Sequence, residues 1–155
     1  RTNIAGVANS KYRLAKLKQK SATSVHGGEP LINDPNFARK IAVLEIELKG
    51  LEYTELRTLA SVKVGNAPGP ESSFLKIRGT EIQQALDELM MEAAGYYALP
   101  YVPAQYDLDF PAEERIGDGA ETITSLRYFN NRKASIYGGS NEIQKNIIAK
   151  HVLGL

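Results

Sequence analysis

Residues 34–65 (DPNFARKIAVLEIELKGLEYTELRTLASVKVG) predict one long amphipathic helix, and this helix decides the fold class. Asp34 suits the N-cap position, because a carboxylate there accepts a hydrogen bond from a free N–H group of the first turn. Pro35 suits the first helical position, where its missing N–H costs nothing. Gly65 is the expected end of the helix. Apolar residues recur at helical spacing along one face: Ile41, Leu44, Leu48, Leu51, Leu56 and Leu59.

Helical periodicity continues on both sides of this segment. We expect further helices at residues 2–22, 73–94 and 120–135 and a fifth near the C-terminal end, whereas no segment shows the sustained alternation of a strand. Antiparallel helices joined by short loops pack most simply as an up-down bundle. The sequence therefore predicts one all-α domain over residues 1–155, an up-down four-helix bundle with an additional C-terminal helix. The residues expected on the buried faces of the other three bundle helices are Ile4, Val7, Tyr12, Leu14, Leu17, Phe74, Leu75, Ile77, Ile82, Leu86, Leu89, Met90, Ile123, Leu126, Tyr128 and Phe129.

The expected connections differ in length. Residues 24–33 and 65–72 are short and rich in turn residues, while residues 96–119 contain several prolines and tyrosines and form a long irregular excursion. Loops of that length in compact domains are usually functional or covered by a partner.

Composition excludes several classes of function. The 155 residues contain no cysteine, which excludes disulfides, thiolate metal sites and cysteine nucleophiles. The net charge of +1 gives no field that would attract nucleic acid, and no stretch approaches the ~20 apolar residues of a membrane span. We expect a cytoplasmic or mitochondrial-matrix location. Arg1 at the first position suggests a reading frame that starts earlier.

Familiar catalytic patterns are also missing. A di-iron bundle site needs Glu-x-x-His pairs, but neither His26 nor His151 has a Glu three residues before it, so we expect no metal. Gly117 and Gly119 resemble the start of a dinucleotide fingerprint, yet no strand precedes them. No Gly-x-Ser-x-Gly elbow is present, and hydrolase chemistry has no support.

Residues 137–155 (YGGSNEIQKNIIAKHVLGL) carry the functional signal, and we call them the signature segment. A Gly-Gly turn leads directly into a helix with Ser140 as the expected N-cap and Glu142 in the first turn, where negative charge is favourable. Such a helix start can aim backbone N–H groups at a ligand. The expected apolar stripe contains Ile143, Ile147, Ile148 and Leu153, and Gly154 ends the helix.

The signature segment resembles the C-terminal signature of the acyl-CoA dehydrogenases. Residues 1–10 (RTNIAGVANS) resemble the opening of the first helix of that family's C-terminal domain, and residues 74–89 (FLKIRGTEIQQALDEL) resemble its third helix. The resemblance implies an FAD-dependent enzyme that desaturates acyl-CoA thioesters between the α and β carbons. It also implies that the N-terminal helical and middle β-domains lie outside this chain, which should be inactive by itself.

The resemblance also implies roles for individual residues. Ser140, Asn141 and Glu142 match positions that contact the flavin. Arg1, Tyr137 and Gly139 match positions that contact the substrate. In many members the catalytic base directly follows the tyrosine of the terminal turn, but here that position is Gly138, which has no side chain. In isovaleryl-type members the base is a glutamate on the first helix, and we therefore expect a Glu directly before Arg1.

Two departures from the family pattern concern partners. The segment that usually reaches the FAD of a neighbouring subunit is replaced by residues 24–28 (SVHGG), and the glutamine-led Gly-Gly motif is replaced by residues 91–95 (MEAAG). Two assemblies are therefore compatible with the sequence. One is a homo-oligomer, and the other is a hetero-oligomer in which a different subunit completes the cofactor site. The alternative function is a non-catalytic helical subunit of such a complex. The family's usual electron acceptor is an electron-transfer flavoprotein.

Overall fold

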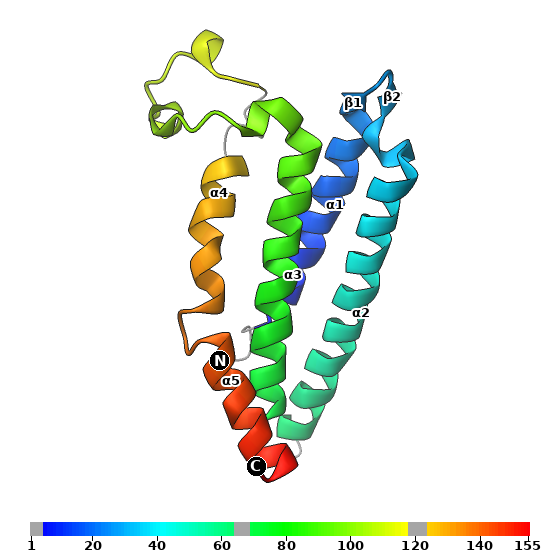
Figure 1. The fold of residues 1–155 in the computed structure, drawn as a ribbon, viewed down its shortest axis with the longest axis vertical. Coiled ribbons are helices and arrows are strands. Elements are labelled where there is room, and N and C mark those ends of the chain that lie inside the picture. Colours follow the sequence, from blue (N-terminus) through cyan, green and yellow to red (C-terminus); the bar gives the residue numbers. More distant parts are fainter. Residues whose placement is uncertain (1–4, 64–68, 118–123) are drawn as a thin grey trace.

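The structure, a computed structural model, describes residues 5–63, 69–117 and 124–155. Its α-helices are α1 (Val7–Thr23), α2 (Pro35–Lys63), α3 (Glu71–Ala94), α4 (Thr124–Asn131) and α5 (Asn141–Ile148). Figure 1 shows successive bundle helices running in alternating directions, with α5 continuing in the direction of α4. The predicted all-α fold is confirmed.

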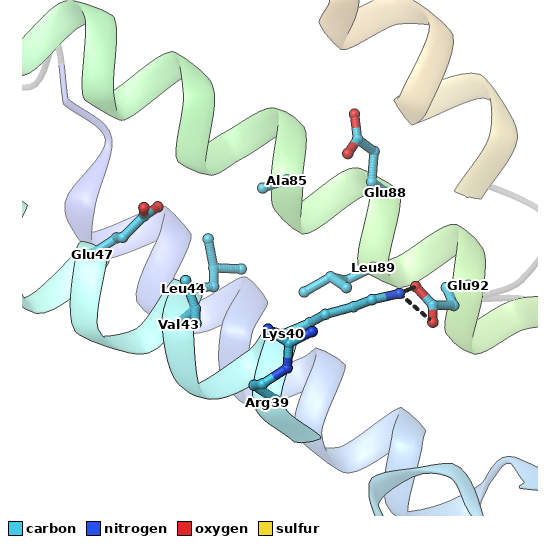
Figure 2. Close-up of a pocket in the computed structure, with 9 residues that line it drawn as sticks. All are labelled: Arg39, Lys40, Val43, Leu44, Glu47, Ala85, Glu88, Leu89 and Glu92. Atoms are coloured by element: carbon cyan, nitrogen blue, oxygen red, sulfur yellow. Dashed lines mark hydrogen bonds and ion pairs between the residues drawn. The ribbon is translucent and has the colours of Figure 1, made fainter. Parts of the chain in front are cut away.

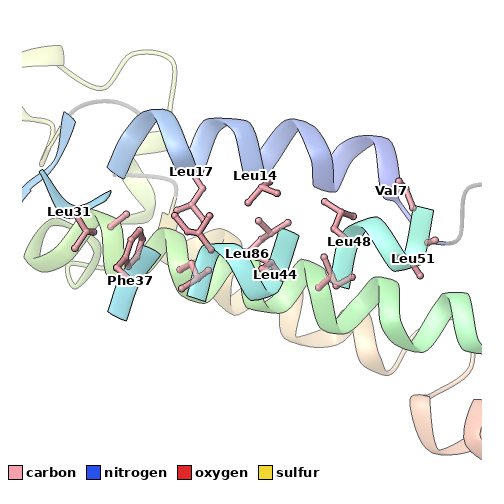
Figure 3. Packing of buried hydrophobic residues seen from close by; sticks show 14 of the residues in the cluster. Val7, Leu14, Leu17, Leu31, Phe37, Leu44, Leu48, Leu51 and Leu86 are labelled. Carbon is pink, nitrogen blue, oxygen red and sulfur yellow. The ribbon is translucent and has the colours of Figure 1, made fainter. Parts of the chain in front are cut away.

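The central element is α3, which contacts α1, α2, α4 and α5. In Figure 1 it lies between the α1–α2 pair and the α4–α5 pair. Leucines from α1, α2 and α3 meet in the main core, where Leu14, Leu17, Leu44 and Leu86 are all buried. Figure 3 shows these side chains pointing toward one another between the helices.

The sequence signals at two helix ends are confirmed. Asp34 Oδ1 accepts a hydrogen bond from the Phe37 N–H at 2.8 Å, so Asp34 caps α2. Gly95 follows α3 with a φ of 58°, a left-handed value that glycine adopts without steric cost. The expected stop at Gly65 lies outside the described residues.

The first helix starts later than predicted. We expected it from Thr2, but α1 begins at Val7, because Gly6 has a φ of 62° and cannot continue a right-handed helix backwards. Residues 1–4, including Arg1 and the expected core residue Ile4, lie outside the described residues.

The connector after α1 forms a small hairpin that the sequence pattern did not predict. Strand β1 (Val25–His26) pairs antiparallel with β2 (Glu29–Pro30). Gly27 and Gly28 have φ values of 61° and 91° and form the tight turn between them. Strands of two residues are too short to show an alternating pattern.

The excursion after α3 is irregular over residues 95–117, as predicted. It contains three 3₁₀ turns, at Gly95–Ala98, Pro103–Tyr106 and Ala112–Glu114. The fourth helix, predicted over 120–135, is described as α4 over Thr124–Asn131, and a 3₁₀ turn continues over Arg132–Ser135, so its α-helical part ends earlier than predicted. Residues 118–123, including Ile123, lie outside the described residues.

Several apolar residues that we expected to be buried are exposed. Tyr12 is two residues before the buried Leu14, which places it about 200° away around the helix. Leu56 follows the buried Leu51 by five residues, about 140° around the helix. Phe74, Phe129, Ile143 and Leu153 are also exposed. We predicted these residues to be buried from their spacing alone, but other positions form the buried face of each helix.

A buried ion pair joins the core to α4. Arg13 on α1 donates to Asp87 on α3, and Asn131 on α4 donates to the other carboxylate oxygen of Asp87 at 2.5 Å. Asp87 is 1% exposed. Burial raises the pKa of Asp87 and lowers the pKa of Arg13, and the attraction between the two charges opposes both shifts.

No helix of the described residues is both long and apolar enough to cross a membrane.

Candidate functional site

The signature segment begins with a tight, exposed turn. Gly138 and Gly139 both have left-handed φ values, 69° and 91°. Tyr137 is 58% exposed directly before them. A Cβ atom at Gly138 would meet nothing within 4 Å, so the turn faces open space there. A side chain at Gly138 would therefore have room, but its backbone conformation would be strained.

Helix α5 starts as the sequence predicts. Ser140 is its N-cap, and the Ser140 Oγ atom accepts a hydrogen bond from the Ile143 N–H at 3.4 Å. Glu142 lies in the first turn and is exposed. Its own backbone N–H and the Ser140 hydroxyl lower the pKa of Glu142. The start of α5 therefore carries a negative charge at neutral pH.

Asn141 faces the bundle. It is 8% exposed, and its Oδ1 atom accepts a hydrogen bond from Lys76 Nζ at 2.7 Å. Its Nδ2 atom donates to Thr80 Oγ1 at 3.2 Å. The side chain is therefore engaged with α3, so a ligand at the turn would meet the backbone of Asn141.

The first described residues pack on the same part of α3. A Cβ atom at Gly79 would lie 2.6 Å from the Ala5 carbonyl oxygen, so Ala5 lies directly against this glycine. A Cβ atom at Gly6 would lie 2.8 Å from Gln83 Nε2. Lys76, Gly79, Thr80 and Gln83 form one stripe along α3, because positions three and four apart share a helix face. We call these four residues the α3 stripe.

The α3 stripe therefore brings together two regions that are far apart in the sequence. The beginning of the described chain contacts Gly79 and Gln83, while the start of α5 contacts Lys76 and Thr80. Arg1 itself lies outside the described residues.

The α3 partners of the turn were missed by sequence reasoning. Lys76 and Thr80 stand four residues apart, a spacing that puts two polar groups on one face of the helix. That spacing was the available signal. It did not indicate Asn141 as their partner, 65 residues after Lys76.

Other concave surfaces lie away from the turn. A groove of about 360 Å³ lies between α2 and α3. Figure 2 shows the residues that line it, including Leu44 and Leu89. Lys40 and Glu92 form an ion pair across it at 2.8 Å. No residue of the turn lines this groove. An apolar lining bordered by an exposed ion pair is typical of a contact between two helices and does not by itself indicate a ligand.

Neither histidine is placed to hold a metal ion. His26 lies on the exposed hairpin, and His151 is exposed near the C-terminal end of the chain. Among the described residues, no three His, Cys, Asp or Glu side chains group as metal ligands would.

Comparison with known families gives a match over nearly the whole chain. The sequence model for the acyl-CoA dehydrogenase C-terminal domain matches residues 1–153. The chain belongs to this family. Acyl-CoA dehydrogenase IpdE1 of Mycobacterium tuberculosis is 30% identical over 109 residues, which cover 66% of this chain and 24% of that protein. Its namesake in Mycolicibacterium smegmatis is 32% identical over 106 residues, covering 68% and 23%.

Solved structures show the same fold at low sequence identity. The glutaryl-coenzyme A dehydrogenase complex with glutaryl-CoA aligns with a TM-score of 0.72 and 19% identity, covering 99% of this chain and 35% of that one. The ChsE4–ChsE5 complex from Mycobacterium tuberculosis aligns with a TM-score of 0.69 and 24% identity, covering 96% and 36%. An FAD complex of PigA aligns with a TM-score of 0.74 and 17% identity, covering 96% and 34%.

This acyl-CoA dehydrogenase domain spans about a quarter of the length of its curated relatives.

Proposed function

We propose that this chain is the C-terminal helical domain of an FAD-dependent acyl-CoA dehydrogenase that desaturates acyl-CoA thioesters between the α and β carbons. The observation that carries this proposal is the α3 stripe. It holds the start of α5 and the first described residues against one surface. A reaction that needs a base from one segment and a flavin contact from the other requires this proximity.

The start of α5 fits a flavin. Gly138 leaves the approach to the turn open, and the first-turn N–H groups of α5 point out of the helix end toward an acceptor. We assign the backbone at Asn141 and the side chains of Ser140 and Glu142 to this contact. The charge of Glu142 would repel a diphosphate, so we place the uncharged ring of FAD at the turn, with the diphosphate held elsewhere.

When bound, FAD accepts a hydride from the β carbon of the substrate. The protein must hold the thioester beside the ring, keep water out and remove the α proton. Tyr137 and Gly139 are our candidates for the substrate contact at the turn, and Arg1 is the candidate on the preceding segment. Tyr137 offers an exposed aromatic face. At Gly139 the Gln144 amide lies where a Cβ atom would be, so a ligand there would meet this amide beside the glycine backbone.

Gly138 cannot supply the base, and its left-handed backbone disfavours a carboxylate residue at that position. We therefore assign the base to a Glu directly before Arg1, on the segment that leads to Ala5 and the α3 stripe.

The test uses the full-length protein that contains this chain. We expect it to purify with bound oxidised flavin and to lose the flavin colour when an acyl-CoA is added without oxygen. Replacing the Glu before Arg1 by Gln should keep the flavin and slow this bleaching by at least about a hundredfold, the lower range for general base catalysis. Glu113→Gln is the matched control, because it makes the same change at an exposed glutamate that has no role in the proposed site. An apolar residue before Arg1 would refute the base assignment.

A second candidate is a non-catalytic subunit of a heteromeric complex, and the absence of a side chain at Gly138 favours it. Native mass spectrometry of the full-length protein distinguishes the two functions. A single subunit type with complete flavin occupancy supports the self-sufficient enzyme, with electron-transfer flavoprotein as the proposed acceptor. Flavin that appears only after a second subunit is added supports the heteromer. We keep a cytoplasmic or mitochondrial-matrix location as part of the proposal.

A further inference from the structure

Lys76 occupies an unusual position for a lysine. It is only 7% exposed, in the second turn of α3 beneath the start of α5. Lysine is among the residues least often buried, because its charge loses solvation. Burial lowers the pKa of Lys76, and the nearby charge of Glu142 opposes this shift. Burying the Lys76 ammonium group costs free energy, so we expect this group to make an interaction that offsets the cost.

The structure shows what Lys76 holds. An ammonium group donates hydrogen bonds and accepts none, so the Asn141 atom that faces it must be the carbonyl oxygen Oδ1, 2.7 Å away. This contact fixes the orientation of the Asn141 amide. Its Nδ2 group then donates to Thr80 Oγ1 at 3.2 Å, and the Thr80 hydroxyl donates to the Ile77 carbonyl at 2.9 Å. The Thr80 hydroxyl also lies 3.4 Å from Asn141 Oδ1, so both Lys76 and Thr80 contact the Asn141 amide.

Asn141 is the first residue of α5. Its side chain is tied to two successive turns of α3, and the two residues before it are Ser140 and the left-handed Gly139. The apolar side chain of Ile143, two residues later, is exposed and adds little to the docking of this helix start. The polar chain from Lys76 therefore determines where the exposed N–H groups of α5 point.

The charge of Lys76 has a second consequence. A positive charge near the N-terminal end of a helix is unfavourable, because that end carries a partial positive charge of its own. Glu142 in the first turn offsets part of this cost. A residue chosen only for packing would be apolar here. An apolar residue could fill this space, but it could not donate a hydrogen bond to Asn141 Oδ1.

We propose that Lys76 is a positioning residue that fixes Asn141 and thereby aims the start of α5 at the cofactor. The part that concerns the cofactor rests on the proposed flavin function. The part that concerns the helix start does not, and the two are tested separately.

The first experiment measures amide hydrogen exchange at residues 143–145, whose N–H groups are hydrogen-bonded at the helix start, in the flavin-free, full-length protein. Lys76→Met keeps most of the side-chain volume and removes the donor. We expect exchange about ten- to a hundredfold faster, the factor that corresponds to the loss of one hydrogen bond to a charged group. Lys76→Gln retains a donor without the charge and should restore part of the protection. Lys40→Met is the control, because it removes an exposed lysine that also bridges two helices.

The second experiment measures the dissociation rate of FAD by the rise in flavin fluorescence, at a temperature well below unfolding for every variant. Lys76→Met should release FAD about tenfold faster or more, and Lys40→Met should match the wild type. Asn141→Leu should have the same effect as Lys76→Met. The double variant should be no worse than either single variant, because both act through one contact.

The outcomes separate the claims. Unchanged exchange in Lys76→Met, or the same acceleration in Lys40→Met, overturns the positioning role. Faster exchange with unchanged FAD release overturns the link to the cofactor. A wild-type protein that binds no FAD defeats the proposed function instead, and the exchange data then decide the role of Lys76 alone.

Discussion

The two sides of α3 are held by different forces. On the side of α1 and α2, buried leucines such as Leu17, Leu44 and Leu86 form the contact. On the side of α4 and α5, none of the described residues belongs to this leucine cluster, and buried hydrogen bonds join Asp87 to Asn131 and Lys76 to Asn141. Apolar packing tolerates small changes of shape, whereas a hydrogen-bond chain fixes direction. The leucine side thus provides stability, and the polar side provides the orientation of the turn.

The largest expected effect comes from the buried ion pair that links both sides. Asp87→Ala leaves Arg13 with an uncompensated buried charge and should cost about 3–5 kcal/mol of unfolding free energy. Equilibrium urea unfolding of the purified protein measures this loss. The control is Glu88→Ala, which breaks an exposed ion pair with Arg132 and should cost less than about 1 kcal/mol. Equal losses in the two variants would show that the pair does not link the two sides.

A core leucine should come next. Leu48 is 3% exposed, and Leu48→Ala should cost about 2–5 kcal/mol because it removes buried surface and leaves a cavity. Ile46, two residues away on the same helix, is 71% exposed. Ile46→Ala should change the unfolding free energy by about 0.5 kcal/mol or less. A large loss for Ile46→Ala in the same urea titration would mean that a partner covers this face.

Two glycines provide a smaller test. Gly79→Ala places a methyl group within 3 Å of the Ala5 backbone, which must move, at a cost of about 1–3 kcal/mol. Gly50 on α2 has open space at the same position, so Gly50→Ala should stabilise the helix by about 0.5–1 kcal/mol. Thermal unfolding compares the two variants. A tolerated Gly79→Ala would contradict the close packing of the first described residues on α3.

The smallest effect is expected at the cap of α5. Ser140→Ala removes the acceptor for the Ile143 N–H and should destabilise the helix start by about 1 kcal/mol. Ser140→Thr keeps the hydroxyl and should lose less. Amide exchange of Ile143 measures both, and equal exchange in the two variants would show that the cap is not formed in solution.

Local signals predicted the parts of the fold that depend on local chemistry. Asp34 followed by Pro35 located the start of α2, and Ser140 located the start of α5, because each cap involves residues only three positions away. The predicted start of α1 was wrong, since nothing in the sequence pattern showed that Gly6 has a left-handed backbone. The burial of Asn141 was also beyond the pattern, because its partners lie 61 and 65 residues earlier.

The order of elements along the chain has a consequence for synthesis. All leucines of the α1–α2–α3 core lie before Gly95, so this core can form while the ribosome is still adding the residues that follow. At ordinary translation rates the signature segment is made on the order of seconds later. During that interval Lys76 lies open to water and is fully solvated. The turn is therefore assembled after this core, and loss of α5 in a truncated product would leave a folded core that lacks it.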